Sequence, residues 1–373
     1  MSEARLRVGL LFGGASVEHE VSVSSARGVA EGLDAERYEI VPLAVAGDGR
    51  WLSPERSRRA LEGRAARTDD PAEGDDGARV VADPGGKGLL RLDADGRARP
   101  VPIDVLFPVL HGWGGEDGRV QGLLDLAGIP CVGAGVLGSA LGMDKISAKS
   151  VFESRGLPVG AWTWIDRARF ERDPSGSSAR IADEIGLPLF VKPSNGGSSV
   201  GVSRVGDADG VRPALLAALA LDRRAVVEAA IDAREIECAV LGNDDPEASV
   251  PGEILPSREF YDYAAKYEDG TSSLLIPAPL DAPTASTVRR IAVEAFRALD
   301  LAGMARVDFF LERGSGRVLL NEVNTLPGFT GISMYPKLWA ATGVPYPGLL
   351  DRLVRLALER ARVSGARTSR LGG

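Results

Sequence analysis

The sequence predicts an α/β protein of several domains, with a parallel sheet in its N-terminal part. Short apolar runs alternate along the chain with segments whose apolar residues have helical spacing. The length of 373 residues exceeds what one hydrophobic core usually spans, so two or three domains are expected. The hydrophobic and charged fractions, 44% and 26%, are those of a globular protein.

The first domain is expected over residues 1–132. Strands are predicted at 5–12, 38–46, 103–110 and 129–132, and helices at 20–33 and 120–127. The strand–loop–helix–strand order at its start is typical of a parallel unit. Residues 54–99 carry many Arg, Asp, Ala and Gly. They are predicted to be surface excursions, partly mobile, around one or two short strands.

Two further domains are expected over residues 133–221 and 222–373. Strands are predicted at 161–165, 188–192, 225–229, 235–241, 306–311 and 318–323. Helices are predicted at 145–155, 178–185, 284–299 and 346–362. The tail 363–373 is expected to fray.

The composition excludes several classes of function. The net charge of −8 argues against a nucleic-acid partner. Cys131 and Cys238 form no CxxC pair, so we expect two buried thiols in a reducing compartment. His19 and His111 form no HExxH pair. No window holds 18 apolar residues, and the run Val8–Phe12 is too short for a signal-peptide core. We therefore expect no membrane partner and a cytoplasmic protein.

Lysine is scarce, which leaves carboxylates, arginines and a few lysines to carry any chemistry. The 44 basic residues include six lysines: Lys87, Lys145, Lys149, Lys192, Lys266 and Lys337. One of them, Lys192, ends a predicted strand and precedes the Gly- and Ser-rich segment Pro193–Gly201. Small residues let backbone N–H groups approach phosphate oxygens, and a lysine adds a point charge. The order is not that of a P-loop, so a phosphate-binding loop and a polar hairpin both stay open.

Polar residues on two later strands predict a metal site. Arg306 and Asp308 share one face of a predicted strand, and Glu322 and Asn324 share a face of the next. Their oxygens form a hard set suited to Mg²⁺, and Arg306 could stabilise developing negative charge. The apolar neighbours favour this site over solvated strand ends. In the following turn, the N–H of Gly328 is a candidate anion donor, although a plain strand-ending turn explains the segment equally.

Three other segments are less specific. Val132–Gly138 matches GxGxxG, but Glu153, which has the spacing of the required acid, lies in a predicted helix. We interpret the segment as a tight strand–helix connection. The aromatic stretch Phe260–Tyr267 is a candidate lid or an ordinary packed excursion. His111, among glycines, is a candidate ligand contact or a loop residue.

Taken in order, these segments resemble the D-alanine–D-alanine ligases of the ATP-grasp superfamily from about residue 8 to 355. The motifs are GGASVE, HGWGGEDG, MDK, VKP, GSSVG, YDYAAKY, RVD and NEVNTLPG. The resemblance implies an α/β fold in which an N-terminal Rossmann-like parallel-sheet domain precedes an ATP-grasp fold of two α+β subdomains. One position departs from the pattern: many members carry Lys where this chain has Ala229, which puts one adenine-side contact in question.

The resemblance also implies site residues. ATP contacts are implied for Lys145, Lys192, Ser199, Glu228, Glu235, Lys266 and Phe310. Ligands of two Mg²⁺ (or Mn²⁺) ions are implied to be Asp308, Glu322 and Asn324. Catalytic roles are implied for Glu18, Ser198, Tyr267, Arg306 and Gly328. Contacts to the two D-alanines are implied for Glu18, His111, Arg306, Gly328, Ser333 and Met334.

The implied activity is ATP-dependent ligation of two D-alanines through an acyl phosphate, for peptidoglycan synthesis, by a homodimer. Two alternatives stay open. One is a relative that makes D-alanyl-D-lactate or D-alanyl-D-serine, against which Tyr267 is a weak argument. The other is a non-catalytic nucleotide sensor, which the joint presence of the phosphate-side lysines and the metal-ligand set disfavours.

Overall fold

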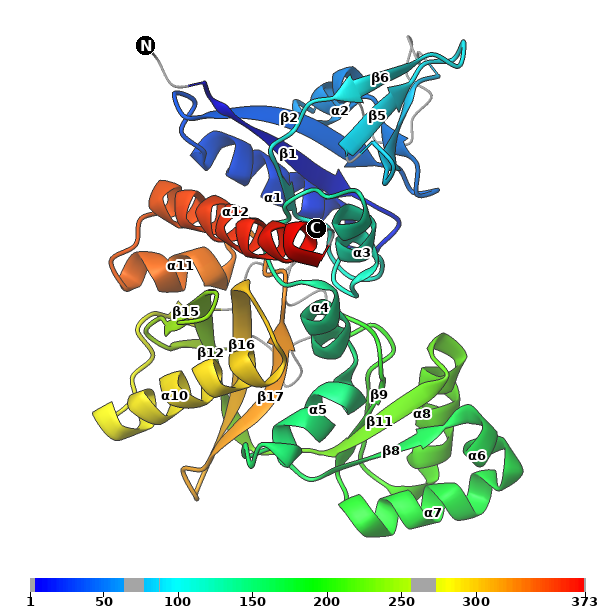
Figure 1. Ribbon diagram of the computed structural model, residues 1–373. Coiled ribbons are helices and arrows are strands. Elements are labelled where there is room, and N and C mark those ends of the chain that lie inside the picture. Colours follow the sequence, from blue (N-terminus) through cyan, green and yellow to red (C-terminus); the bar gives the residue numbers. More distant parts are fainter. Residues whose placement is uncertain (1–3, 64–76, 87, 256–272, 372–373) are drawn as a thin grey trace.

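The computed structural model describes residues 4–63, 77–86, 88–255 and 273–371, which form three β-sheets with helices around them (Figure 1). The N-terminal sheet has the strand order β6-β5-β4-β3-β2-β1-β7. Its strands are β1 (Leu6–Gly13), β2 (Tyr38–Val45), β3 (Trp51–Leu52), β4 (Arg79–Asp83), β5 (Gly88–Leu92), β6 (Ala98–Val101) and β7 (Val105–Pro108). β1 pairs in parallel with β2 and β7, which confirms the predicted parallel unit. The predicted helices are α1 (His19–Gly32) and α3 (Arg119–Leu126).

Residues 54–99 are more regular than the sequence predicts. Helix α2 (Pro54–Leu61) begins at a Ser53 cap, and β4, β5 and β6 continue the sheet with antiparallel pairing. The expectation of one or two short strands is therefore wrong. Val80, Leu89 and Val101 are buried in the core of this sheet, but polar and glycine neighbours conceal the alternation in the sequence.

The predicted strand at 129–132 is not formed as a ladder. One parallel bridge joins Cys131 to Leu106, and the chain then turns through Gly133 and Gly135 into helix α4 (Val136–Met143). Gly133 has φ +94°, a conformation that favours glycine. The GxGxxG segment thus forms a tight connection into a helix, as the sequence suggested.

The second sheet has the order β10-β9-β11-β8 and lies at the lower right of Figure 1. Its strands are β8 (Trp162–Asp166), β9 (Leu189–Pro193), β10 (Ser203–Val205) and β11 (Arg224–Ala229). Its helices are α6 (Arg167–Arg172), α7 (Pro174–Ile185) and α8 (Ala208–Leu221), and α5 (Lys145–Ser154) leads into it. β11 pairs with β8 and β9 and therefore belongs to this second sheet. The boundary expected between residues 221 and 222 placed this strand in the third domain instead.

The third sheet has the order β15-β14-β12-β16-β17, with β13 paired to β12. Its strands are β12 (Ala233–Gly242), β13 (Glu247–Ala248), β14 (Gly252–Leu255), β15 (Ser273–Leu275), β16 (Gly303–Glu312) and β17 (Val318–Asn324). Helix α10 (Ala282–Ala298) packs on it through Val288, Ile291 and Phe296. Buried apolar side chains therefore cover one face and leave the polar residues of β12, β16 and β17 to the other.

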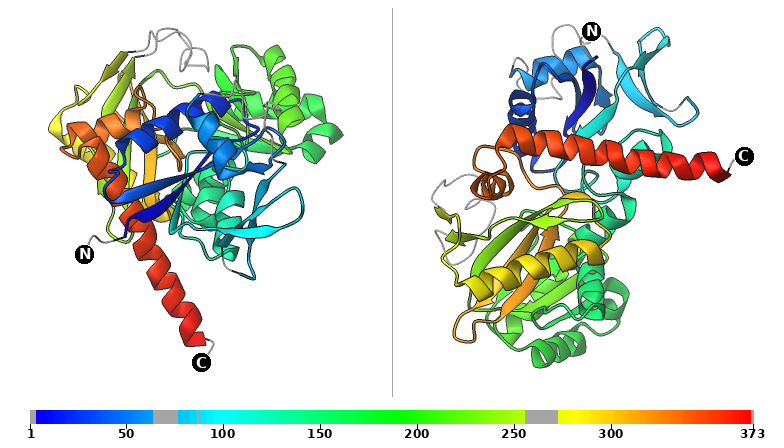
Figure 2. Two further views of the ribbon diagram at one scale, coloured as in Figure 1. Left: turned by 90° about the horizontal axis from the view of Figure 1, so that it is seen from above. Right: turned by 60° about the vertical axis from the view of Figure 1, so that its left-hand side comes forward.

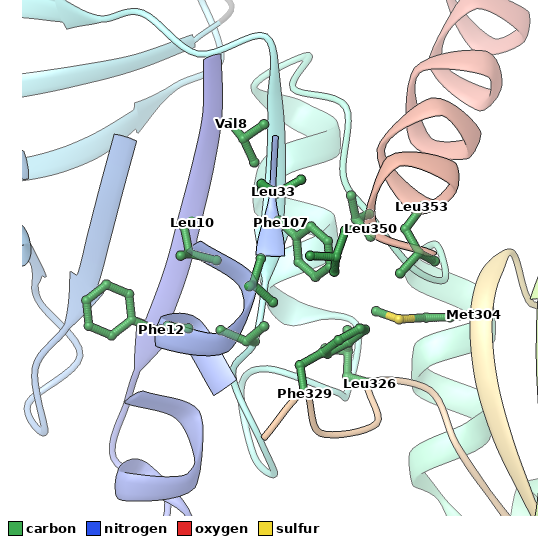
Figure 3. Close-up of a cluster of buried hydrophobic side chains, with 14 of the residues drawn as sticks. Val8, Leu10, Phe12, Leu33, Phe107, Met304, Leu326, Phe329, Leu350 and Leu353 are labelled. Atoms are coloured by element: carbon green, nitrogen blue, oxygen red, sulfur yellow. The ribbon is translucent and has the colours of Figure 1, made fainter. Parts of the chain in front are cut away.

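The C-terminal helices α11 (Met334–Ala341) and α12 (Tyr346–Leu371) join the first sheet to the third. Leu350 and Leu353 of α12 share one core cluster with Phe107 and Phe329 (Figure 3). The rings of Phe107 and Phe329 meet edge to face, with centroids 5.5 Å apart. This packing fixes the loop after β17 against the N-terminal domain.

Helix α12 does not end at residue 362. It runs to Leu371 and projects from the body of the protein, so the expectation of a frayed tail from residue 363 is wrong up to that point (Figure 2). Residues 363–371 contain no Pro, and their one Gly, Gly365, does not break the helix. Among the described residues, no helix is both long and apolar enough to span a membrane.

Candidate active site

Two neighbouring cavities lie where the three sheets meet. The larger, of about 700 Å³, has walls from the second and third sheets, and the smaller, of about 160 Å³, is closed by Glu18 and His111 of the N-terminal domain. Both are lined by Lys145, Arg306 and Glu322. A chemical group bound in one cavity would therefore meet a group bound in the other at these side chains.

The larger cavity contains a buried cluster of one carboxylate and two ammonium groups. Glu228 of β11 lies 2.7 Å from Lys149 Nζ through Oε1 and 2.5 Å from Lys192 Nζ through Oε2. Burial alone raises the pKa of Glu228, but the two lysines outweigh it and hold this pKa well below its ordinary value. The same contacts raise the pKa of Lys192 against the effect of its burial. Glu228 and Lys192 are therefore both charged at neutral pH.

The rest of this cavity gathers other predicted ATP contacts. It is lined by Lys145, Ser199, Glu235 and Phe310, and Ala229 also contributes to its wall. Glu235 and Phe310 are direct partners in the β12–β16 ladder, so both point to one face of the sheet. Lys266 and Tyr267, which were also predicted for the site, lie outside the described residues.

The loop after β9 is held at its base by Asp144. This residue caps α5 by accepting from the N–H of Ser147 and also accepts from Ser194 Oγ, 2.9 Å away, and from Asn195 Nδ2, 3.0 Å away. Arg224 Nη2 lies 2.5 Å from the same carboxylate. Burial raises the pKa of Asp144, but these donors and the guanidinium lower it overall.

Beyond this anchor the loop has strained backbone. Ser198 and Ser199 have φ of 48° and 58°, values that residues other than glycine rarely adopt. Lys145 Nζ donates to the carbonyl of Gly196 at 2.7 Å, and a Cβ added at Gly197 would be in van der Waals contact with Glu18 Oε2, at 3.6 Å. The loop thus separates the two cavities and contacts residues of both.

A polar row crosses the third sheet. Asp308 pairs in register with Glu237 of β12 on one side and with Glu322 of β17 on the other, and Arg306 pairs with Asn324. Arg306 holds Asp308 through two contacts, Nε to Oδ1 at 2.8 Å and Nη2 to Oδ2 at 2.7 Å. Arg306 Nε also lies 3.1 Å from Glu237 Oε2. The structure therefore brings together the side chains that the sequence placed on these two strand faces.

This donor set fits a hard divalent cation. Asp308, Glu322 and Asn324 supply two carboxylates and an amide from neighbouring strands, the oxygen chemistry that Mg²⁺ prefers. Asn324 Oδ1 accepts from the N–H of Leu326 at 3.0 Å, which orients its amide. In the part of the chain that the structure describes, no three His, Cys, Asp or Glu side chains are grouped to bind a metal by themselves.

The smaller cavity is lined by residues from several segments that lie far apart in the sequence. Glu18 precedes α1 and is 8% exposed, and His111 lies 3.5 Å from Glu116 through Nδ1 and 3.4 Å from Ser25 Oγ through Nε2. Burial lowers the pKa of His111, but Glu116 outweighs it and raises this pKa. Gly328, Ser333 and Met334 complete the lining.

A side chain at Gly328 would require Ser333 to move. An added Cβ would lie 2.7 Å from Ser333 Oγ, which itself accepts from the N–H of Thr330 at 3.0 Å. Ser198 and Gly197 line the same cavity, so the loop after β9, the turn after β17 and the N-terminal domain all converge on it.

Several site residues were not predicted. Lys149 follows Lys145 by four residues on one helix, a spacing that places both on one face. Glu237 follows Glu235 by two residues on one strand, which does the same. Glu116 and Asp144 stood inside recognised motifs but had no assigned role. Periodicity could have found the first two, whereas the partners of Asp144 come from distant segments that only the fold brings together.

The fold and the site define an ATP-grasp protein: a cavity between two sheets, with lysines on one wall and a carboxylate row on the other. Family models described as the N-terminus and C-terminus of D-ala D-ala ligase match residues 7–134 and 151–355. The chain belongs to the D-alanine–D-alanine ligase family.

Individual relatives cover nearly the whole chain. It is 46% identical over 366 residues to the D-alanine–D-alanine ligase of Ruminiclostridium cellulolyticum, which covers 96% of each chain. It is 48% identical over 354 residues to that of a Thermoanaerobacter species, covering 95% of this chain and 96% of the relative.

Solved structures of similar proteins agree. The D-alanine-D-alanine ligase of Coxiella burnetii has a TM-score of 0.81 at 36% identity and covers 99% of both chains. The VanG D-Ala:D-Ser ligase of Enterococcus faecalis also has a TM-score of 0.81, at 33% identity, covering 95% of this chain and all of the other.

Proposed function

We propose that this protein joins two molecules of D-alanine into D-alanyl-D-alanine and converts ATP to ADP and phosphate. The observation that carries the proposal is the wall shared by the two cavities. Lys145, Arg306 and Glu322 line both, so the terminal phosphate of a nucleotide in the larger cavity would meet a carboxylate in the smaller one. Catalysis of this kind depends on positioning and charge neutralisation more than on a covalent nucleophile.

Each cavity suits one substrate. Lys145 and Lys192 would neutralise the phosphates of ATP, with Ser199, Glu228, Glu235 and Phe310 contacting the same nucleotide. Glu18, beside Ser198 and His111, would bind the ammonium of the first D-alanine. Ser333 and Met334, at the start of α11, would lie at the carboxylate of the second D-alanine.

The reaction has two steps. A carboxylate oxygen of the first D-alanine bonds to the γ-phosphorus while the bond to the β,γ-bridging oxygen breaks, which gives an acyl phosphate and ADP. The amine of the second D-alanine then attacks the acyl carbon, phosphate leaves with its oxygen, and the amine loses a proton. Arg306 and the N–H of Gly328 would donate to the oxygen that becomes negative in this second step.

Asp308, Glu322 and Asn324 would hold two Mg²⁺ (or Mn²⁺) ions. Such ions neutralise phosphoryl oxygens as charge develops on them.

Four further expectations remain proposals. The domains would span 1–132, 133–221 and 222–373, except that β11 belongs to the sheet of the second domain, and a homodimer would form through the first. The protein would act in the cytoplasm, where the dipeptide serves peptidoglycan synthesis, and its partners would be small molecules only. Light scattering of the purified protein would test the dimer.

The direct test measures phosphate release from ATP with D-alanine, L-alanine, D-serine or D-lactate supplied, and identifies the product by mass spectrometry. We expect D-alanine alone to give release and a dipeptide. No release that depends on D-alanine would overturn the proposal. Release that needs D-alanine plus D-serine would instead favour the activity named for the similar VanG enzyme.

A further inference from the structure

Lys149 is a buried lysine to which neither the motifs nor the proposed reaction assigns a role. It lies on α5, one turn beyond Lys145, and is 4% exposed. Its Nζ lies 2.7 Å from Glu228 Oε1 and donates to the backbone carbonyl of Asn321 at 3.3 Å. Both Lys149 and its carboxylate partner line the larger cavity.

The cluster holds one positive charge in excess. Glu228 presents one oxygen to Lys149 and the other to Lys192, so two ammonium groups share a single carboxylate. The side chain of Lys192 is 14% exposed and that of Lys149 only 5%. Lys192 lies one residue before the end of β9, next to the Gly- and Ser-rich loop, whereas Lys149 is fixed by a helix and a second acceptor. Lys192 is therefore the ammonium group that can leave.

We propose that Lys149 is a positioning residue that keeps Glu228 paired when a nucleotide phosphate draws Lys192 away from it. The inference rests on the proposed function, which sets Lys192 against the phosphates of ATP. Without Lys149, nucleotide binding would strand a buried carboxylate with no cation, which is costly in a desolvated site. With Lys149 in place, the cluster supplies one cation to the phosphates and leaves a neutral pair behind.

The charged groups around this cluster are consistent with a move of Lys192 from Glu228 to a nucleotide phosphate. Glu228 faces Lys149 from α5 and Lys192 from β9, and its own strand neighbours across the ladder are Phe190 and Trp162, which carry no charge. Glu235 and Glu322 of the third sheet act on Lys192 and raise its pKa further. Lys192 thus has negative groups around it in the free protein, and phosphate oxygens would replace them.

The test compares Lys149→Met with Lys149→Arg and with Lys337→Met, which removes a lysine of α11 outside both cavities. The probe is AMP-PNP with Mg²⁺, titrated by calorimetry near pH 7 in two buffers of different ionisation enthalpy, so that proton uptake is counted with affinity. We expect wild type and Lys337→Met to bind with little proton uptake. Lys149→Met should bind at least about tenfold more weakly and take up close to one proton, because a buried carboxylate without a cation protonates. Lys149→Arg should restore both properties in part.

Unchanged affinity and proton count in Lys149→Met would overturn the inference. If that variant does not fold, the Glu228→Gln background decides. In that background residue 228 is an uncharged Gln, so adding Lys149→Met should change the affinity for AMP-PNP less than about threefold. A tenfold loss in that background would mean that Lys149 binds the nucleotide directly, which would also overturn the inference.

The outcome is separable from that of the proposed function. A wild type that binds AMP-PNP but releases no phosphate with D-alanine would refute the ligase activity, and the proton count would still decide the role of Lys149. A wild type that does not bind AMP-PNP would refute both.

Discussion

Asp308 and Glu322 lie directly opposite each other on the antiparallel strands β16 and β17, so their carboxylates share one face of the third sheet. This pairing would let residues 14 positions apart in sequence bind one metal ion. The Asp308→Asn variant keeps the shape but removes one charged oxygen donor. We expect turnover to fall by about tenfold or more at low Mg²⁺ and to recover partly as Mg²⁺ is raised. The measurement is phosphate release against Mg²⁺ concentration.

Glu312→Gln is the matched control for this variant. Glu312 lies on the same strand, at the end remote from the polar row, and pairs with Arg317. Its loss should leave the Mg²⁺ profile unchanged. An unaltered profile in Asp308→Asn would reject a metal role for this carboxylate.

A variant at Glu18 tests the role of the N-terminal domain in D-alanine binding separately from nucleotide binding. Its carboxylate lines the smaller cavity together with His111 and the loop after β9, whereas Lys149 and Lys192 line the larger one. Glu18→Gln removes the charge that would pair with an ammonium group. We expect the KM for D-alanine at the first site to rise by about tenfold or more, with the KM for ATP nearly unchanged. Steady-state kinetics with each substrate varied will measure this.

The exposed Glu20, two residues along the chain, provides the control. Glu20→Gln makes the same chemical change outside the cavity and should leave both KM values as in wild type. Equal rises in the KM for ATP and for D-alanine in Glu18→Gln would contradict a specific role at the first substrate.

Sequence patterns predicted the elements well where apolar periodicity was strong. Strands β9, β12, β16 and β17 and helices α1, α5 and α10 lie close to their expected positions. The number of strands in segment 54–99 was predicted too low, because charged and glycine residues lie between buried ones such as Val80 and Leu89. In the site, strand alternation placed Arg306, Asp308, Glu322 and Asn324 together, since that depends on local geometry alone. Partners from distant elements, such as Lys149 with Glu228, required the fold.

Asp144 links pH to the anchoring of the glycine-rich loop. Its pKa in the folded protein is below the ordinary value of 3.8 because Ser147, Ser194 and Arg224 outweigh the effect of burial. A lowered pKa gives stability that is present above the unfolded value and is lost as the pH falls through the folded value. Asp144→Asn should therefore reduce the free energy of unfolding by ~1–3 kcal/mol at pH 7, and by progressively less below about pH 4.

Thermal melts of wild type and Asp144→Asn across this pH range will show whether the gap in Tm closes. The weaker anchor should also raise the KM for ATP several-fold, because Ser194 and Asn195 lose a charged acceptor. A gap in Tm that stays constant from pH 7 to pH 3 would argue against the ionised carboxylate as its cause.

Both cysteine thiols are expected to be unreactive toward disulfide reagents in the folded protein. Cys131 is 7% exposed and Cys238 fully buried, and burial raises the pKa of each thiol to about 12. Since the thiolate is the reactive form, only about 10⁻⁴ of either thiol is ionised at pH 8. A disulfide reagent such as DTNB at pH 8 should label neither cysteine on a scale of minutes in the native protein, and both after unfolding in guanidinium. Rapid labelling of one equivalent in the native protein would show that a cysteine is reachable from solvent, which contradicts the packing of that residue in its core.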